Sequence, residues 1–182
     1  MGFDALGLLA LFSTAGFTLK LADLCGELRI SNLAFFSAGI CGILFGILIA
    51  ESSFSSAIVS GIVLGVAVAG KINRANLVFG LAVATLTAFI LGFSVPLVWL
   101  LLIVALFAFL DEILHDRFAV RAGLLNGLFA YRCCLKLAVI GLAVLNLLPL
   151  LYAGGFLLFD ITYDVAAVLF DRLGVVPWLR KF

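Results

Sequence analysis

The sequence predicts an all-α protein that is embedded in a membrane as a bundle of about seven transmembrane helices. Of its 182 residues, 66% are hydrophobic and only 12% are charged, and the mean hydropathy is +1.36. Soluble domains are about 45–50% apolar and about 25% charged, and a soluble chain of this length could not cover so much apolar surface. The apolar residues form continuous runs such as 95–110 instead of the alternation of a membrane β-barrel. Helices are then the structure that satisfies the backbone within lipid.

Seven segments of the chain meet the requirement of about 20 mostly apolar residues for a spanning helix. The predicted spans are 3–24, 33–51, 56–74, 76–94, 96–115, 125–148 and 149–171. Asn146 and Pro149 mark the break between the last two spans, because proline is favoured as the first residue of a new helix. No polar stretch is long enough to form a soluble domain, so we expect residues 1–182 to form a single integral membrane domain.

Basic residues follow the connectors in an alternating pattern. They occur at Lys20 and Arg29, at Lys71 and Arg74, at Arg117 and Arg121, and at Arg172, Arg180 and Lys181. The other connectors carry no lysine or arginine. Cytoplasmic connectors are the ones enriched in these residues, so we expect an outside N-terminus, a cytoplasmic C-terminus and a multi-pass location in the cell membrane. The expected partner is the lipid bilayer, and the net charge of +1 predicts no nucleic-acid partner.

Small residues recur every four positions on two of the predicted helices. They are Ala38, Gly42, Gly46 and Ala50 on the second helix and Gly61 and Gly65 on the third. Such faces allow helix backbones to approach closely in lipid. They predict close helix packing, and they also provide surfaces through which copies of the chain could form an oligomer.

Ionisable residues also lie inside the predicted spans, where they are costly and indicate function by default. At a rise of about 1.5 Å per residue, Lys136 and Asp160 lie near the membrane midplane. Arg132 and Asp164 lie about one turn closer to the cytoplasm. Since almost no loop joins the last two spans, we expect these helices to be antiparallel neighbours that form the pairs Lys136–Asp160 and Arg132–Asp164.

Other charges on the first, third and fifth spans lie at a similar depth. The predicted site consists of Lys20, Lys71, Asp111, Glu112, His115, Arg132, Lys136, Asp160, Tyr163 and Asp164. Lipid cannot solvate these groups, so they must face one another or a water-filled pocket open to the cytoplasm. The sequence therefore predicts a protein, like a transporter or a channel, that handles an ion or a small polar solute.

Two alternatives remain open at this point. An enzyme of the inner leaflet that processes lipids or phosphate esters would use Mg²⁺, which prefers oxygen ligands and substrate phosphates. The Glu112-x-x-His115 spacing resembles half of a di-metal carboxylate site, but the chain has one histidine and that site needs two. No other cofactor is evident. The third interpretation is a structural membrane subunit whose ion pairs only fix helix register.

Overall fold

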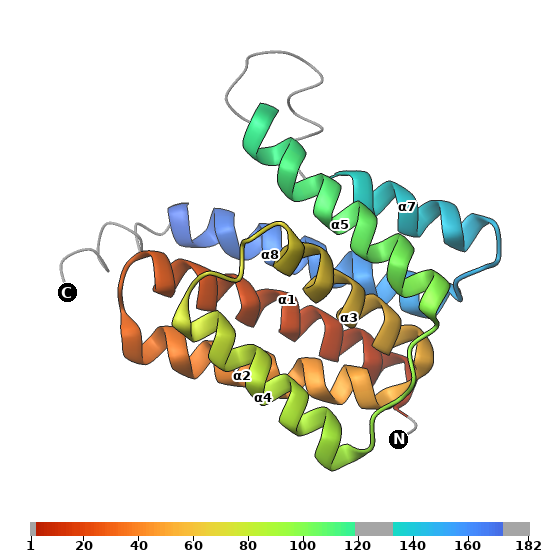
Figure 1. Cartoon of the computed structure of the whole chain (residues 1–182), viewed down its shortest axis with the longest axis horizontal. Helices are drawn as coiled ribbons and strands as arrows, with labels where there is room; N and C mark the ends of the chain where they lie inside the picture. The colour runs from red at the N-terminus through yellow and green to blue at the C-terminus, as the bar shows by residue number, and fades with distance from the viewer. Residues whose placement is uncertain (1–2, 119–132, 173–182) are drawn as a thin grey trace. The chain divides into compact units, whose positions relative to one another are not determined.

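The chain is helical throughout the part that the computed structural model describes, residues 3–118 and 133–172. Seven helices cover 85% of these residues, and no strand occurs among them (Figure 1). The helices are α1 (Ala5–Glu27), α2 (Ser31–Glu51), α3 (Ser53–Val68), α4 (Ala75–Leu91), α5 (Val98–Phe118), α7 (Cys133–Val144) and α8 (Leu150–Arg172). The predicted all-α bundle is confirmed, while residues 125–132 of the predicted sixth span lie outside the described ranges.

Four of these helices, α1, α2, α5 and α8, are long and apolar enough to cross a membrane. The helices α3, α4 and α7 are apolar but have 16, 17 and 12 residues. At 1.5 Å per residue, α3 and α4 measure about 24–26 Å against a hydrocarbon core of about 30 Å. Large side chains cover the outside, and Phe89 and Leu150 are both 79% exposed. Apolar surface of this extent is suited to lipid acyl chains.

Three helices end with the same backbone motif, in which one residue takes the left-handed conformation. These residues are Gly70 after α3, Arg29 after α1 and Asn146 after α7, with φ of 74°, 60° and 57°. In each case the next amide reaches back to the last turn: Lys71 N to Val66 O (3.1 Å), Ile30 N to Cys25 O (3.0 Å) and Leu147 N to Leu142 O (2.9 Å). This is the Schellman arrangement, which satisfies carbonyls left free at a helix end. It confirms the predicted break at Asn146, and it ends α3 at Val68 instead of residue 74.

The described helices pack into two compact units. One unit contains α1, α2, α4 and α8 from Gly154 onward, and the other contains α3, α5 and α7. Fully buried apolar side chains occur in both, such as Phe12 and Phe156 in the first unit and Ile58 and Leu100 in the second.

In the first unit, small residues let two pairs of helices pack side by side. A methyl group added at Gly42 would lie 2.9 Å from Val83 Cβ, and one at Gly46 would lie 2.7 Å from Ala84 O. Contacts that advance together along both helices show that α2 and α4 run parallel.

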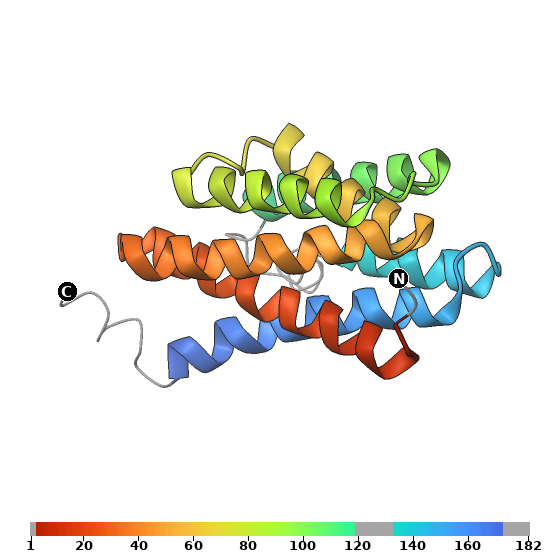
Figure 2. The same cartoon turned by 90° about the horizontal axis from the view of Figure 1, so that it is seen from below.

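Helix α8 lies beside α1 in the same unit (Figure 2). The Thr162 hydroxyl donates to Ser13 O at 2.7 Å, and a methyl group at Gly155 would lie 2.5 Å from Phe12 Cδ2. Because Phe12 and Ser13 of α1 meet Gly155 and Thr162 of α8 in the same order, these two helices are also parallel.

In the second unit, α3 packs against α5 through its own glycines. A methyl group at Gly61 would lie 2.8 Å from Val104 Cβ, and one at Gly65 would lie 2.7 Å from Ala108 Cβ. These helices are therefore parallel too, and α5 also contacts α7. The small residues predicted to mediate close packing do so within the chain, and oligomer formation through them stays a prediction.

The parallel pairs agree with a chain that reverses direction at each connector. Helices α2 and α4 are separated by one helix, as are α3 and α5, and parallel α1 and α8 require an odd number of crossings. The uncharged connectors are joined within the second unit, where Ser56 Oγ donates to Ser94 O at 2.8 Å and the Phe54 ring stacks on Tyr152 at 5.3 Å. The N-outside orientation stays a prediction.

Candidate functional site

Two carboxylates are buried near the C-terminal end of α5. Asp111 and Glu112 are each 5% exposed, in a helix that is otherwise apolar from residue 98 to residue 110. The first of them is held by the backbone of α7, since Cys134 N–H donates to Asp111 Oδ1 and Leu135 N–H donates to Oδ2, both at 2.9 Å. A negative charge at a helix N-terminus satisfies free amides and opposes the positive end of the helix dipole. Asp111 therefore anchors α7 to α5.

Glu112 and His115 are one turn apart on the same helix, and residues with this spacing share a helix face. The Nδ1 atom of His115 is buried and, within the described part of the chain, has no hydrogen-bond partner. Buried polar atoms are nearly always paired, so an unpaired one needs an explanation such as a water, an ion or a chemical role. The imidazole of His115 is the group of α5 that invites such an explanation.

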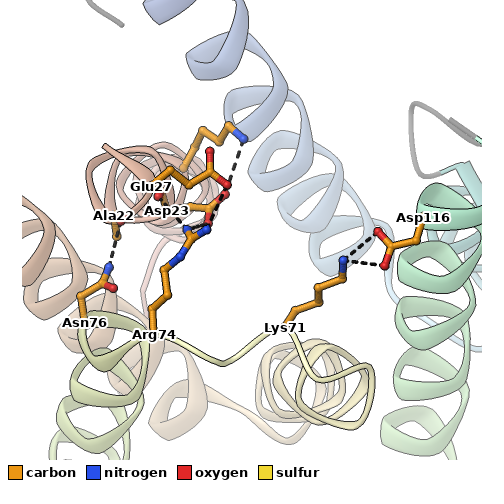
Figure 3. A network of polar contacts seen from close by, with 8 residues as sticks. Ala22, Asp23, Glu27, Lys71, Arg74, Asn76 and Asp116 are labelled. Carbon is orange, nitrogen blue, oxygen red and sulfur yellow. Dashed lines mark hydrogen bonds and ion pairs between the residues drawn. The ribbon is translucent and has the colours of Figure 1, made fainter. Parts of the chain in front are cut away.

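Lys71 pairs with Asp116, one residue beyond His115. Its Nζ atom contacts both carboxylate oxygens (Figure 3), at 2.7 Å each. The two side chains are 35% and 55% exposed. The sequence placed Lys71 in the deep site. The structure brings them together in a partly exposed pair, which contributes at most about 1 kcal/mol.

Arg74 joins the end of α1 to the start of α4 in the first unit (Figure 3). Its guanidinium lies 3.2 Å from Asp23 Oδ1 and 3.3 Å from Glu27 Oε1. Asn76 is buried beside it and donates from Nδ2 to Ala22 O at 2.9 Å. These contacts place two basic connectors, one after α1 and one before α4, at the same end of the unit.

Asn76 is absent from the predicted site. The sequence signal that could have revealed it is a polar side chain in the first turn of an apolar helix. In the structure this side chain faces Gly26 of α1, where a methyl group would lie 3.0 Å from Asn76 Oδ1.

Lys20 and Tyr163 are two predicted site residues that the structure does bring together. The Lys20 Nζ atom lies 4.8 Å from the centre of the Tyr163 ring and 3.7 Å from Asp23 Oδ2. The lysine side chain is only 16% exposed. A cation over an aromatic face is attracted to the ring, more strongly when it is shielded from water, so this contact stabilises a charge within α1.

Asp160 and Asp164 lie on α8, away from the side that packs on α1. Gly155 and Thr162 face α1, and at about 100° per residue both aspartates lie roughly 140–180° from Gly155 around the helix. Lys136 belongs to the second unit, and Arg132 lies outside the described residues. The pairs Lys136–Asp160 and Arg132–Asp164 stay predictions.

Metal binding is the remaining chemistry that the sequence suggested. Among the residues that the structure describes, no three histidine, cysteine, aspartate or glutamate side chains converge as a metal site. The Mg²⁺ site stays a prediction of the enzyme alternative. Both carboxylate oxygens of Asp111 already accept hydrogen bonds from backbone amides.

Comparison of the chain with protein-family models, with curated proteins and with solved structures finds no match.

Proposed function

We propose that the protein is a multi-pass membrane protein that handles an ion or a small polar solute, as a carrier or channel does, at charges buried in its helices. The observation that carries the proposal is the pair Glu112 and His115 on α5, a helix long and apolar enough to cross a membrane. Glu112 is 5% exposed, and the His115 Nδ1 atom is buried and unpaired within the described residues. An ionisable group within a membrane helix is costly, and a function at that position accounts for its presence.

The contacts of the other charges support a division of roles. Asp111 caps α7, Arg74 joins α1 to α4, and Lys71 forms a surface pair. These three residues agree with the structural-subunit interpretation, since each has a partner that explains its position. The described residues provide no such partner for His115 Nδ1, so the functional interpretation rests on the α5 pair.

The test is solute flux through purified protein reconstituted in liposomes. The probes are radiolabelled sodium, rubidium and phosphate, together with an entrapped pH-sensitive dye. We expect the wild-type protein to move at least one probe faster than protein-free liposomes do. We expect Glu112→Gln to lower that flux at least tenfold, since the amide keeps the shape of the side chain and removes its charge and its proton affinity.

The matched control is Asp116→Asn, which makes the same change one turn further along α5, at a carboxylate that is 55% exposed. It should keep most of the flux. Gel filtration and circular dichroism would establish that both variants are folded. The proposal fails if wild-type liposomes move every probe no faster than empty ones, or if Glu112→Gln and Asp116→Asn behave alike.

A further inference from the structure

Arg29 takes a backbone conformation that residues with a Cβ atom rarely adopt. Three helices of the described chain end with the same left-handed turn, and two of them place Gly70 and Asn146 there, the residue types that tolerate it. The third places Arg29 there, with φ of 60°. The turn is held by hydrogen bonds from the Arg29 amide to Gly26 O and from the next amide to Cys25 O. A strained conformation that the fold keeps points to a function of the side chain.

The other described charges at this end of α1 balance one another. Two cations pair there with two carboxylates, and the four residues are Lys20, Arg74, Asp23 and Glu27. The aspartates of α8 flank Tyr163, whose ring contacts Lys20 more than two turns before Arg29. Arg29 is exposed and belongs to none of the ion pairs within the described residues. It therefore adds one uncompensated positive charge to the surface of this turn.

An exposed apolar helix face begins close to this charge. Helix α2 begins at Ser31, two residues after Arg29, and it is long and apolar enough to cross a membrane. Phe36 and Ile43 are exposed, and residues seven apart share a helix face. Phe36 lies about 7–8 Å along the axis from the start of α2. Charge and apolar surface thus follow one another in the order in which a phospholipid presents its phosphate and its acyl chains.

We infer that Arg29 binds the phosphate of an anionic phospholipid whose acyl chains lie along Phe36 and Ile43 of α2. Arginine presents a planar fork of N–H donors that matches the oxygens of a phosphate group. A soluble anion would leave the neighbouring apolar face unused, and a zwitterionic lipid would bring a second positive charge toward the guanidinium. The lipid site goes beyond the proposed function and does not depend on solute handling.

The test compares how many molecules of two lipids the protein retains. The protein is placed in nanodiscs of equal parts phosphatidylglycerol, which is anionic, and phosphatidylcholine, which is zwitterionic, and native mass spectrometry counts the bound lipids. We expect the wild-type protein to retain more phosphatidylglycerol. Arg29→Gln should lower this preference by about fivefold or more, the loss of one basic contact with anionic lipid. Arg29→Lys should lower it less, because it keeps the charge without the planar fork.

Two further variants separate the site from general effects. Arg117→Gln removes the charge of an exposed arginine on α5 and should keep the preference. Arg29→Gly relieves the backbone strain, so it should unfold at a higher temperature than the wild-type protein in neutral detergent. A ligand that binds the folded state raises the unfolding temperature. Phosphatidylglycerol should therefore raise it more than phosphatidylcholine does in the wild-type protein, and equally in Arg29→Gly.

The inference is overturned if the wild-type protein retains both lipids equally. It is also overturned if Arg29→Gln and Arg117→Gln lower the preference alike, as attraction to a charged membrane surface alone would. Inorganic phosphate that raises the unfolding temperature as much as phosphatidylglycerol would contradict the lipid assignment, because the site would then not require acyl chains. Solute flux does not enter these results, so a failure of the proposed function would leave the lipid site standing.

Discussion

One buried carboxylate of this protein has a structural role that its position in the sequence did not reveal. Asp111 and Glu112 are adjacent and equally buried, and the sequence predicted both as site residues. The partners of Asp111 are backbone amides 23 and 24 positions away. No residue pattern marks a backbone amide as a partner, so its role as a cap was visible only in the fold. The burial of the two carboxylates, in contrast, could be predicted from their position at the end of an apolar run.

The cap formed by Asp111 predicts a loss of stability when it is removed. Asp111→Ala leaves the amides of Cys134 and Leu135 without acceptors, and we expect it to lower the free energy of unfolding by about 2–4 kcal/mol. Asp111→Asn keeps one acceptor and should cost about half as much. Unfolding in detergent measures both effects. Asp116→Ala, which breaks a partly exposed pair, should cost at most about 1 kcal/mol, and an equal cost for the two alanine variants would contradict the cap.

The left-handed residues at the helix ends predict gains in stability. Arg29 takes φ of 60° after α1, a conformation that costs a residue with a Cβ atom about 1–2 kcal/mol. We expect Arg29→Gly to raise the free energy of unfolding by about 1 kcal/mol, because glycine has no Cβ atom. Asn146→Gly should gain less, since asparagine tolerates this conformation. Thermal unfolding of both variants compares the two gains in stability. A larger gain for Asn146→Gly than for Arg29→Gly would contradict the assigned backbone conformations.

At the scale of elements, the small-residue spacing predicted close packing but not the partner of each face. The pattern at Gly42 and Gly46 and at Gly61 and Gly65 follows from sequence, since i and i+4 share a helix face. In each case the partner is the second helix along the chain, which runs parallel. That choice depends on how several helices compete for the same faces, and no spacing within one helix records it. The predicted end of α3 was also wrong, because the span included residues 69–74 although the helix ends at Val68, before the turn at Gly70.

The α3–α5 contact predicts unequal effects of two glycine substitutions. At Gly65 a methyl group would meet Ala108 Cβ at 2.7 Å, whereas nothing lies within 4 Å at Gly141 on α7. We expect Gly65→Ala to cost about 1–3 kcal/mol through overpacking. Gly141→Ala should instead be neutral or gain up to about 1 kcal/mol, because alanine favours helix. Chemical unfolding in detergent compares them, and equal shifts would show that α3 and α5 do not pack as described.

At the scale of the molecule, the alternation of connectors with and without lysine or arginine is visible in the sequence and predicts the topology. Within the first unit, Arg74 joins two charged connectors. Within the second, Ser56 and Ser94 join two uncharged ones. Parallel α1 and α8 agree with an odd number of spans. The predicted pairs Lys136–Asp160 and Arg132–Asp164 depend instead on how one helix is rotated against another, which the charges of the connectors do not record.

The topology predicts the behaviour of fusions at both ends of the chain. A fluorescent protein that matures only in the cytoplasm should be bright at the C-terminus and dark at the N-terminus. A phosphatase that is active only outside the cytoplasm should show the reverse. The positive-inside rule is the physical reason, since basic connectors stay on the cytoplasmic side. High activity of a phosphatase fused to the C-terminus would contradict the predicted orientation.

The central claim is that Glu112 lies inside the helix bundle while Asp116, one turn further along α5, lies at its surface. The most direct measurement is thiol labelling of Glu112→Cys and Asp116→Cys, each in a background without the four native cysteines, by a reagent that does not enter lipid. We predict that position 116 reacts at least tenfold faster than position 112 in folded protein, and that the two rates become equal after denaturation. Equal rates in the folded protein would place Glu112 at the surface and contradict the claim.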